Sequence, residues 1–192
     1  MSTHDAIVKQ VAHSRVIPVV ENRMQLAHIL KQPGKGGMLM LHRCNVLELG
    51  PLMVYAHEKG YAVYVNIDHI DGVHADAAGF HYLAYQLHVA GIESTNPKLL
   101  ALARSAHLAT VLHIYAADSA GLESALETTN FQMVDLLDIS PALVIPYIYP
   151  ALTNVLPLPF LGSGLISTAQ QAQAVIDAGA LGALVSQTDV TG

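Results

Sequence analysis

The residues Gly162-Ser163-Gly164-Leu165-Ile166 form a turn of small residues between a short apolar run, Leu158–Leu161, and a predicted helix, Thr168–Ala178. Glycine lets the backbone approach a ligand closely, and free N–H groups at a helix start favour an anion. The run before this turn is the seventh of eight such runs, each followed by a helix-like stretch or by the C-terminus. In a parallel barrel, the loop after strand seven often holds phosphate. The turn therefore predicts a phosphorylated small ligand and a barrel that presents it.

The eight apolar runs are short and rich in β-branched residues, as strands buried on both faces are. We expect strands at Val16–Val20, Gly37–His42, Ala62–Asn66, Gly91–Ser94, Thr110–Ile114, Met133–Asp138, Leu158–Leu161 and Gly182–Ser186. Helices are expected at Arg23–Lys31, Val46–Lys59, Val73–Val89, Pro97–Ala106, Ser119–Thr129, Ala142–Ala151 and Thr168–Ala178. This alternation indicates right-handed crossovers and a parallel sheet, so the fold class is α/β.

A closed (β/α)8 barrel and an open doubly wound sheet both fit this alternation. An open sheet of this length usually has fewer strands, whereas 192 residues suffice for a compact barrel. We therefore favour a single domain over residues 1–192, a TIM-like barrel of about eight parallel strands with the last helix missing.

Composition limits the compartment and the partners. Hydrophobic residues make up 52% of the chain, yet no stretch approaches the ~20 apolar residues of a membrane span. The N-terminus carries no apolar signal core, and Cys44 has no partner for a disulfide, so we expect a cytoplasmic protein. The formal net charge of −6 argues against tight nucleic-acid binding by the isolated chain. It does not exclude nucleic-acid binding by an oligomer that gathers the few basic residues of several copies. The high apolar content favours a homo-oligomer.

In a barrel, functional residues lie at the carboxyl ends of the strands. The expected strand ends carry Glu21, His42-Arg43, Asn66 with Asp68, Ser94 with Asn96, His113, Asp138 with Ser140, Ser163-Gly164 and Ser186-Gln187. A single polar strand end is ordinary, but the whole ring predicts a pocket. The residues expected to bind the ligand and its phosphate are Ser163, Gly164, Ser186, Ser94, Asn96, Asp68, His113 and Asp138.

The densest polar stretch follows the third strand and contains Asp68, His69, Asp71 and His74, which are potential ligands for a cation. Asp71 and His74 have the spacing to share the first turn of the predicted helix Val73–Val89. Alternatively, Asp71 is the N-terminal cap of that helix. The metal motif His-Glu-x-x-His is absent, so we assign neither a metal nor a cofactor.

Motifs for catalysis are weak. Gly-x-Ser-x-Gly is missing, and no lysine stands at a predicted strand end to form a Schiff base. Cys44 with His42 is either a thiol–imidazole pair or inert packing. An enzyme, such as a metal-dependent hydrolase or a sugar-phosphate isomerase using Asp68, His69 and Asp138, is the alternative function.

The order of several motifs along the chain indicates a family. The motifs are Ile17-Pro18-Val19-Val20, Asn66-Ile67-Asp68-His69-Ile70-Asp71-Gly72-Val73, Gly91-Ile92-Glu93-Ser94-Thr95-Asn96, Asp118-Ser119, Asp138-Ile139-Ser140-Pro141-Ala142, Gly164-Leu165-Ile166-Ser167-Thr168 and Ala178-Gly179-Ala180. In these motifs the chain resembles the glycerol-3-phosphate-responsive antiterminators, which regulate glycerol uptake operons.

The resemblance implies a regulator that binds glycerol 3-phosphate or a similar small phosphorylated ligand, acts on leader mRNA and catalyses no reaction. It assigns ligand-site roles to Asp68, to Ser94-Thr95, to Asp138 and to the turn Ser163-Gly164. A barrel that lost its ligand and serves protein–protein contact is a further hypothesis.

The chain departs from the family pattern at several positions. Glu21 replaces a basic residue, His113 and Ser167 replace arginines, Ser163 replaces a glycine and Ala142 replaces another. Because a charge-assisted hydrogen bond contributes ~1.5–3 kcal/mol, the missing cations predict a weaker or different ligand.

Overall fold

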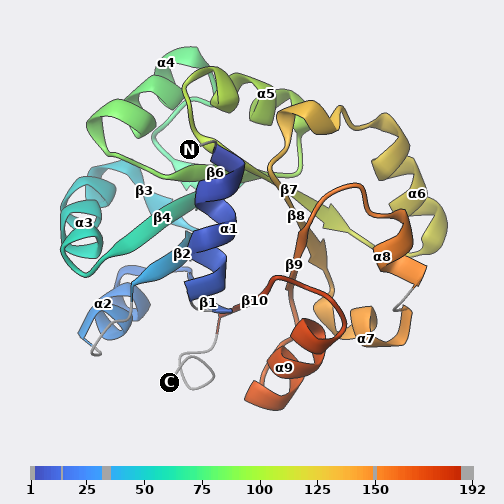
Figure 1. Ribbon diagram of the computed structural model, residues 1–192. Helices are drawn as coiled ribbons and strands as arrows, with labels where there is room; N and C mark the ends of the chain where they lie inside the picture. Colours follow the sequence, from blue (N-terminus) through green and yellow to red (C-terminus); the bar gives the residue numbers. More distant parts are fainter. Residues whose placement is uncertain (1–2, 14, 32–35, 149–150, 187–192) are drawn as a thin grey trace.

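Eight parallel strands close into a barrel in the computed structural model, which describes residues 3–13, 15–31, 36–148 and 151–186 (Figure 1). Their order around the barrel is β1-β10-β9-β8-β7-β6-β4-β2. The strands are β1 (Val16–Val20), β2 (Gly37–Leu41), β4 (Tyr61–Asn66), β6 (Gly91–Ser94), β7 (Ala109–Tyr115), β8 (Leu136–Ser140), β9 (Phe160–Ser163) and β10 (Gly182–Val185). The closed ring confirms the predicted TIM-like barrel and excludes the open sheet.

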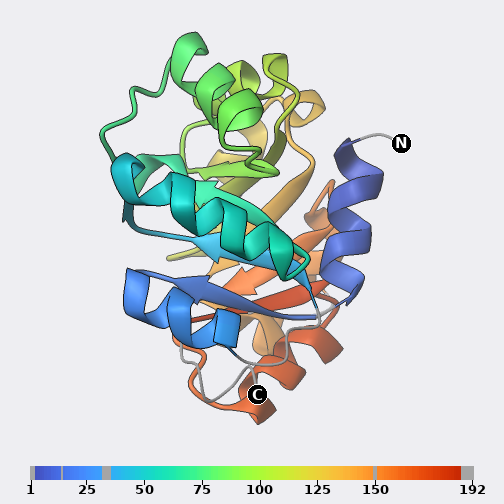
Figure 2. The same ribbon diagram turned by 90° about the vertical axis from the view of Figure 1, so that its left-hand side faces the viewer.

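Helices lie outside the strands (Figures 1 and 2). They are α2 (Arg23–Lys31), α3 (Val46–Glu58), α4 (Ala77–His81), α5 (Pro97–Ser105), α6 (Ser119–Thr128), α7 (Ile145–Ile148), α8 (Ala151–Val155) and α9 (Ala169–Asp177). Several begin at side-chain caps that the sequence encodes locally, such as Asn45, Asn96 and Asp118. The strand β10 ends at Val185. The prediction that no helix follows the last strand falls on residues 187–192, which lie outside the described residues.

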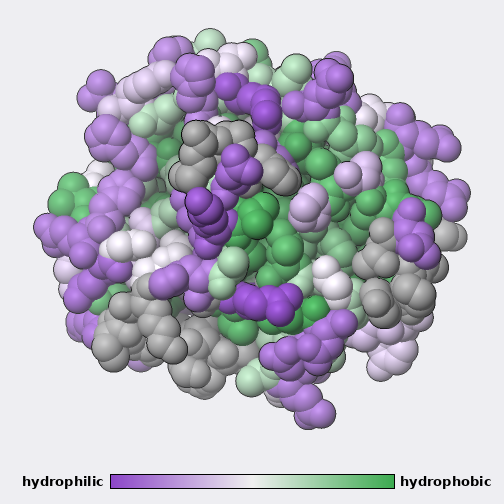
Figure 3. Space-filling model, viewed as in Figure 1, coloured by the Kyte–Doolittle hydropathy of each residue, from purple (hydrophilic) through white to green (hydrophobic). Residues whose placement is uncertain are grey.

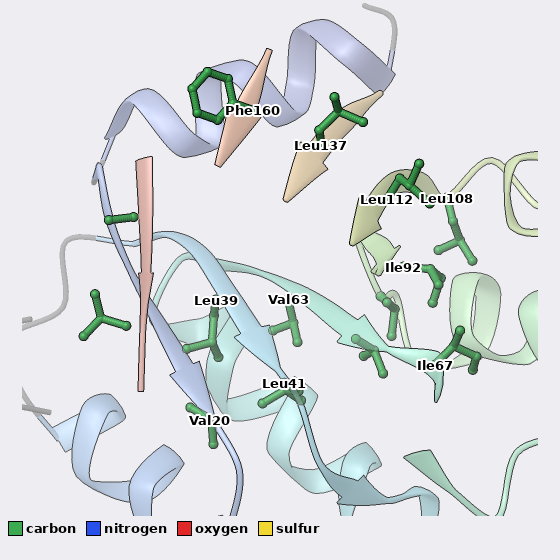
Figure 4. Packing of buried hydrophobic residues seen from close by; sticks show 14 of the residues in the cluster. Val20, Leu39, Leu41, Val63, Ile67, Ile92, Leu108, Leu112, Leu137 and Phe160 are labelled. Atoms are coloured by element: carbon green, nitrogen blue, oxygen red, sulfur yellow. The ribbon is translucent and has the colours of Figure 1, made fainter. Parts of the chain in front are cut away.

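The core has two layers. The larger one fills the space between strands and helices, and Figure 4 shows members of it along successive strands, from Val20 on β1 to Phe160 on β9. The smaller layer fills the barrel interior and includes Ile7 and Val11. These two residues belong to α1 (Thr3–His13), which the sequence analysis did not predict because it began at the first strand.

Helix α1 covers the amino-terminal end of the barrel. It lies beyond the strands at one end of the molecule, with hydrophilic residues on its outer side (Figures 2 and 3). Inside, Tyr64 Oη of β4 donates a hydrogen bond of 2.6 Å to Gln10 Oε1. Helix α1 does not cover the opposite, carboxyl-terminal end of the barrel, which we call the mouth. Within the described residues, no helix is long and apolar enough to cross a membrane.

The predicted helix Val73–Val89 is wrong at its start. Asp71 lies in β5 (Ile70–Asp71), which pairs with β3 (Cys44–Asn45) in a small separate sheet. Gly72 then turns the chain with a left-handed φ of +83°. Helix α4 begins only after Asp76, whose side chain accepts a hydrogen bond from Gly79 N, and it continues as a π-helical segment, η2 (Tyr82–Gln86).

Other boundaries also differ from the sequence prediction. Strand β9 lies two residues later than the predicted Leu158–Leu161, so Gly162 and Ser163 belong to the strand and the turn begins at Gly164. A 3-10 turn, η3 (Phe131–Met133), precedes β8, so this strand begins later than Met133 and extends to Ser140. The predicted helix Ala142–Ala151 is divided into η4 (Ala142–Val144), α7 and α8, with residues 149–150 outside the described part. Prolines in this segment remove helical hydrogen bonds.

Glycine at position 91 makes room for the tyrosine that joins α1 to the barrel. A Cβ atom at Gly91 would lie 2.3 Å from Tyr64 Cε1 and 2.7 Å from Ala109 O. Because the Ala109 atom belongs to the neighbouring strand's backbone, the clash cannot be relieved by rotating a side chain alone. We expect Gly91→Ala to lower the free energy of unfolding by about 1–3 kcal/mol in urea titrations.

Gly50 in α3 is the matched control. A Cβ atom there meets nothing closer than Leu87 Cδ2 at 3.8 Å, so Gly50→Ala should stabilise the helix by about 0.5–1 kcal/mol. Equal stability of the two variants would contradict the packing described for Tyr64.

Candidate functional site

Two carboxylates and two imidazoles meet inside the mouth, and we call them the mouth cluster. Its members are Glu93 of β6, His113 of β7, Asp138 of β8 and His42, which directly follows β2. Glu93 and Asp138 are both 0% exposed. Parallel strands place these residues at one end of the barrel although they are distant in sequence.

The imidazole of His113 lies between the two carboxylates. Its Nδ1 is 2.6 Å from Asp138 Oδ2 and 3.8 Å from Glu93 Oε1. The strand register places His113 directly opposite Asp138. Ser163 Oγ of β9 donates a second hydrogen bond, of 2.7 Å, to Asp138 Oδ2. Three of the predicted ligand residues, His113, Asp138 and Ser163, are thus in contact.

Glu93 has its own partners on the other side of the cluster. Asn66 Nδ2, at the end of β4, donates a hydrogen bond of 2.8 Å to Glu93 Oε2. His42 Nε2 lies 2.9 Å from the same oxygen, which is an ion-pair distance without hydrogen-bond alignment. Residues of β4, β7 and β9, together with His42 after β2, therefore surround one carboxylate pair.

The cluster shifts the pKa values of its members. Burial alone lowers the pKa of His113, but Asp138 and Glu93 outweigh it and raise this pKa to about 10. Burial raises the pKa of Glu93, whereas His113 and His42 lower it, with a net result of about 2. Burial and the charge of Glu93 raise the pKa of Asp138. Glu93 and His113 therefore form a charged pair at neutral pH.

Four buried atoms of the cluster have no hydrogen-bond partner among the described residues. They are Glu93 Oε1, Asp138 Oδ1, His113 Nε2 and His42 Nε2. Unsatisfied buried polar atoms cost free energy and are uncommon in folded proteins. Because these atoms converge in one cluster, a ligand bound at the mouth could supply the hydrogen bonds or charge that they lack.

A second polar group, around Asp68, lies on the rim. Asp68 is exposed, and its carboxylate accepts hydrogen bonds from Ser94 Oγ (2.6 Å), Thr95 N (2.8 Å) and Thr95 Oγ1 (3.0 Å). Asn66 Oδ1 accepts from Asp68 N and lies 3.1 Å from His69 Nδ1, so Asn66 links the rim to the mouth cluster.

The predicted ligand residue Asn96 serves as a helix cap in this structure. Its side chain accepts a hydrogen bond from Lys98 N at the start of α5, and its own N–H donates to Ser94 Oγ. Asn96 is exposed, whereas Ser94 is buried beneath Asp68. These bonds fix the β6–α5 loop. Because Ser94 Oγ already donates one hydrogen bond and accepts another, it has little hydrogen-bonding capacity left for a ligand.

The turn after β9 has the left-handed backbone that its glycine predicted. Gly164 has a φ of +82° and lies exposed beside Ser140, and Leu165 has a φ of +63° with 73% of its surface exposed. Ser186, the next predicted ligand residue, is exposed just beyond β10, the strand paired with β9. Ser163, Gly164 and Ser186 are therefore neighbours at the mouth.

The start of α9 differs from the expectation of free N–H groups. Thr168 and Gln171 form a reciprocal capping box. Gln171 Oε1 also accepts a hydrogen bond of 2.8 Å from Ser167 N. An anion at this turn would therefore use the backbone before Ser167, because the helix start is already capped by its own side chains.

Comparison with known proteins agrees with the motifs. A sequence profile of the family described as glycerol-3-phosphate responsive antiterminator matches residues 16–190. The chain belongs to this family. No curated protein sequence matches the chain.

Solved structures of similar fold include two proteins that are named for glycerol uptake operons. The glycerol uptake operon antiterminator regulatory protein of Listeria monocytogenes superposes with a TM-score of 0.79 at 22% identity, covering 90% of this chain and 92% of that one. An antiterminator-related protein of Thermotoga maritima gives 0.77 at 18% identity, with coverages of 93% and 98%. A deoxyribose phosphate aldolase of Aeropyrum pernix gives 0.66 at 12% identity, with coverages of 96% and 94%. At these identities the likeness concerns the fold.

Membership in the antiterminator family makes the chain a regulator and not an enzyme. The alternative catalytic set of Asp68, His69 and Asp138 is also divided between the rim and the mouth cluster. Among the described residues, no hydrogen bond or ion pair joins Asp68 to Asp138.

This antiterminator-family chain brings its candidate metal ligands together at an unexpected place. Asp71 lies in β5 and His74 in the loop after it, both exposed and not in a helical turn. The group of described residues with metal-ligand spacing is instead Glu93, His113 and Asp138. Sequence analysis placed Glu93 only in the family motif; its signal was one carboxylate inside a four-residue buried strand.

Cys44 does not pair with His42, whose imidazole faces Glu93. Burial, with smaller contributions from Glu48 and Asp71, raises the pKa of the Cys44 thiol to about 11. We therefore expect iodoacetamide to alkylate Cys44 roughly 100-fold more slowly near neutral pH than it alkylates the urea-unfolded chain. Below this pKa, the rate should rise about tenfold per pH unit because the thiolate fraction does. A plateau near the ordinary thiol pKa would contradict the assignment.

Proposed function

We propose that this chain is a cytoplasmic antiterminator that binds glycerol 3-phosphate, or a similar small phosphorylated polyol, at the mouth and then acts on the leader RNA of a glycerol-utilisation operon. The observation that carries the proposal is the turn after β9, where Gly164 and Leu165 adopt left-handed φ values beside the buried Ser163. Family membership supports the ligand class.

The turn is suited to a phosphoryl group for two physical reasons. Its backbone enters the left-handed region at Gly164 and Leu165, a conformation that turns can use to direct N–H groups at an anion. Gly164 is also needed for the shape of the turn, since a Cβ there would lie 2.7 Å from Ser140 Oγ and would have to displace that side chain. Hydroxyl groups of the polyol would then face the polar side chains of the rim, including Asp68 and Ser186.

Conformational coupling to RNA would follow from selective binding of one state. A ligand that binds the RNA-competent form more tightly shifts the population toward it. Basic residues gather away from the mouth, where Lys9, His13, His57 and Lys59 line a cavity of about 760 Å³ at the amino-terminal end. This is the surface we propose for phosphate contacts with RNA, and a homo-oligomer would bring several copies of it together.

Thermal unfolding tests the ligand. Glycerol 3-phosphate at ~100 times its dissociation constant should add about 2.7 kcal/mol, which raises Tm by about 5–10 °C for a chain of this size. Glycerol and inorganic phosphate should each give a smaller shift. The proposal fails if no phosphorylated polyol raises Tm.

Two glycine variants locate the site. Gly164→Ala should abolish most of the ligand-induced shift, measured from the variant's own baseline, because the added Cβ enters the turn. Gly179→Ala is the matched control, since Gly179 also has a positive φ (+94°) but precedes β10 at the amino-terminal end. An equal loss of ligand response in both variants would contradict a site at the mouth.

Binding to leader RNA is measured separately, with and without glycerol 3-phosphate. The ligand should tighten binding, and Lys59→Ala should weaken it for all RNA sequences and reduce its salt dependence by about one unit of slope. Lys98→Ala on α5 serves as the control of equal charge change. Unchanged binding by Lys59→Ala would exclude the amino-terminal surface as the RNA contact.

A further inference from the structure

We propose that Glu93, His113 and Asp138 bind one divalent transition-metal ion in the mouth, with Zn²⁺ as the ion that best fits the donors. One ligand atom from each of the three side chains lies within 4.8 Å of the others. This site goes beyond the proposed ligand-responsive function and does not rest on it.

The geometry is close to that of a bound ion. Zn²⁺ holds imidazole nitrogen and carboxylate oxygen at about 2.0–2.2 Å, which places neighbouring ligand atoms roughly 3–3.5 Å apart. His113 Nδ1 lies 2.6 Å from Asp138 Oδ2 and 3.8 Å from Glu93 Oε1, on either side of this range. Neighbouring strands carry the three residues, so the backbone keeps them on one side of the barrel wall and the ligands are preorganised.

Unsatisfied atoms point independently to a missing partner. Glu93 Oε1 and Asp138 Oδ1 belong to side chains that are 0% exposed, and neither accepts a hydrogen bond among the described residues. His113 Nε2 is also without a partner there. A cation between the three side chains would be bound by Glu93 Oε1 and Asp138 Oδ1, which removes both of their costs, and by His113 Nδ1, the nitrogen that lies nearest the two carboxylates.

Charge supports the same conclusion. Two fully buried carboxylates repel each other, and no lysine or arginine pairs with either among the residues that the structure describes. The imidazolium of His113 balances one of the two charges, and a divalent ion that replaces its Nδ1 proton would neutralise both carboxylates. Asn66 and Ser163 would remain hydrogen-bonded to the outer oxygens of Glu93 and Asp138, which orients both ligands.

The donor set selects the class of ion. Two oxygens and one nitrogen suit Zn²⁺, Mn²⁺ and Fe²⁺, whereas a hard cation such as Mg²⁺ prefers oxygen alone. No thiol belongs to the group, because Cys44 lies apart in β3. His42 Nε2 lies 2.9 Å from Glu93 Oε2 but is not part of this three-residue group.

Direct metal binding tests the site, with no phosphorylated ligand present. Untagged protein, stripped with EDTA, is titrated with Zn²⁺ by calorimetry and with Co²⁺ by visible absorption. The wild-type chain should bind one ion, and the Co²⁺ complex should show the d–d bands of a low-symmetry site. Paramagnetically shifted proton resonances of a coordinated imidazole should appear in the Co²⁺ protein.

Glu93→Gln and Asp138→Asn should each weaken metal binding by at least about 100-fold. Mutating residues that only hydrogen-bond to metal ligands already lowers affinity by about 10–100-fold, and these variants change the ligands themselves. The matched control is Asp71→Asn. It alters an exposed acidic residue that the sequence also predicted as a metal ligand, and it should leave metal binding unchanged.

Absence of metal binding by the folded wild-type chain overturns the proposal, whatever the variants do. So does tight binding that survives Glu93→Gln and Asp138→Asn but is lost in His74→Ala, because it would place the ion on the exposed loop. Failure of metal binding together with a normal response to glycerol 3-phosphate would leave the proposed function standing. The reverse result would leave the metal site standing.

Discussion

Two carboxylates buried inside an apolar barrel are the constraint on which the mouth depends. Removing an ionised group from water costs several kcal/mol unless other groups replace its solvation. Glu93 and Asp138 obtain that replacement from His113, His42, Asn66 and Ser163. These partners come from different strands, so the site exists only when the barrel is closed.

The same constraint sets the chemistry that the mouth offers. An anionic ligand at the turn after β9 would lie near Asp138, whose partner Ser163 precedes that turn. Repulsion between the two would be reduced by the protonated imidazole of His113, or by a divalent ion in its vicinity. His113 and Ser163, the two partners of Asp138, thus determine how charge is balanced at the mouth.

Much of the fold could be predicted from the sequence because its signals are local. Alternating apolar runs and caps such as Asn96 and Asp118 predicted strand order and most helix starts. The helix after β4 was predicted to begin too early, because the residues from Val73 onward have helical spacing. The chain instead turns at Gly72, directly after the pairing between β3 and β5, and this pairing cannot be seen in the sequence. Helix α1 was not predicted, because it precedes the first strand and its role is to cover the end of the barrel, which is a tertiary contact.

The site was predictable only in part, for a related reason. Strand ends identified Asp68, His113, Asp138 and Ser163, but not which of them touch. Glu93 precedes its strand end by one residue, so whether it faces the interior depends on strand register and barrel closure. Contacts across the barrel, such as that between His42 and Glu93, leave no trace in spacing along the chain.

A crystal structure of the protein with glycerol 3-phosphate tests the central claim most directly. The account predicts phosphate density at the turn between Ser163 and Ile166, with the polyol facing the mouth cluster. Density in the amino-terminal cavity beneath α1, with the mouth left empty, would contradict it.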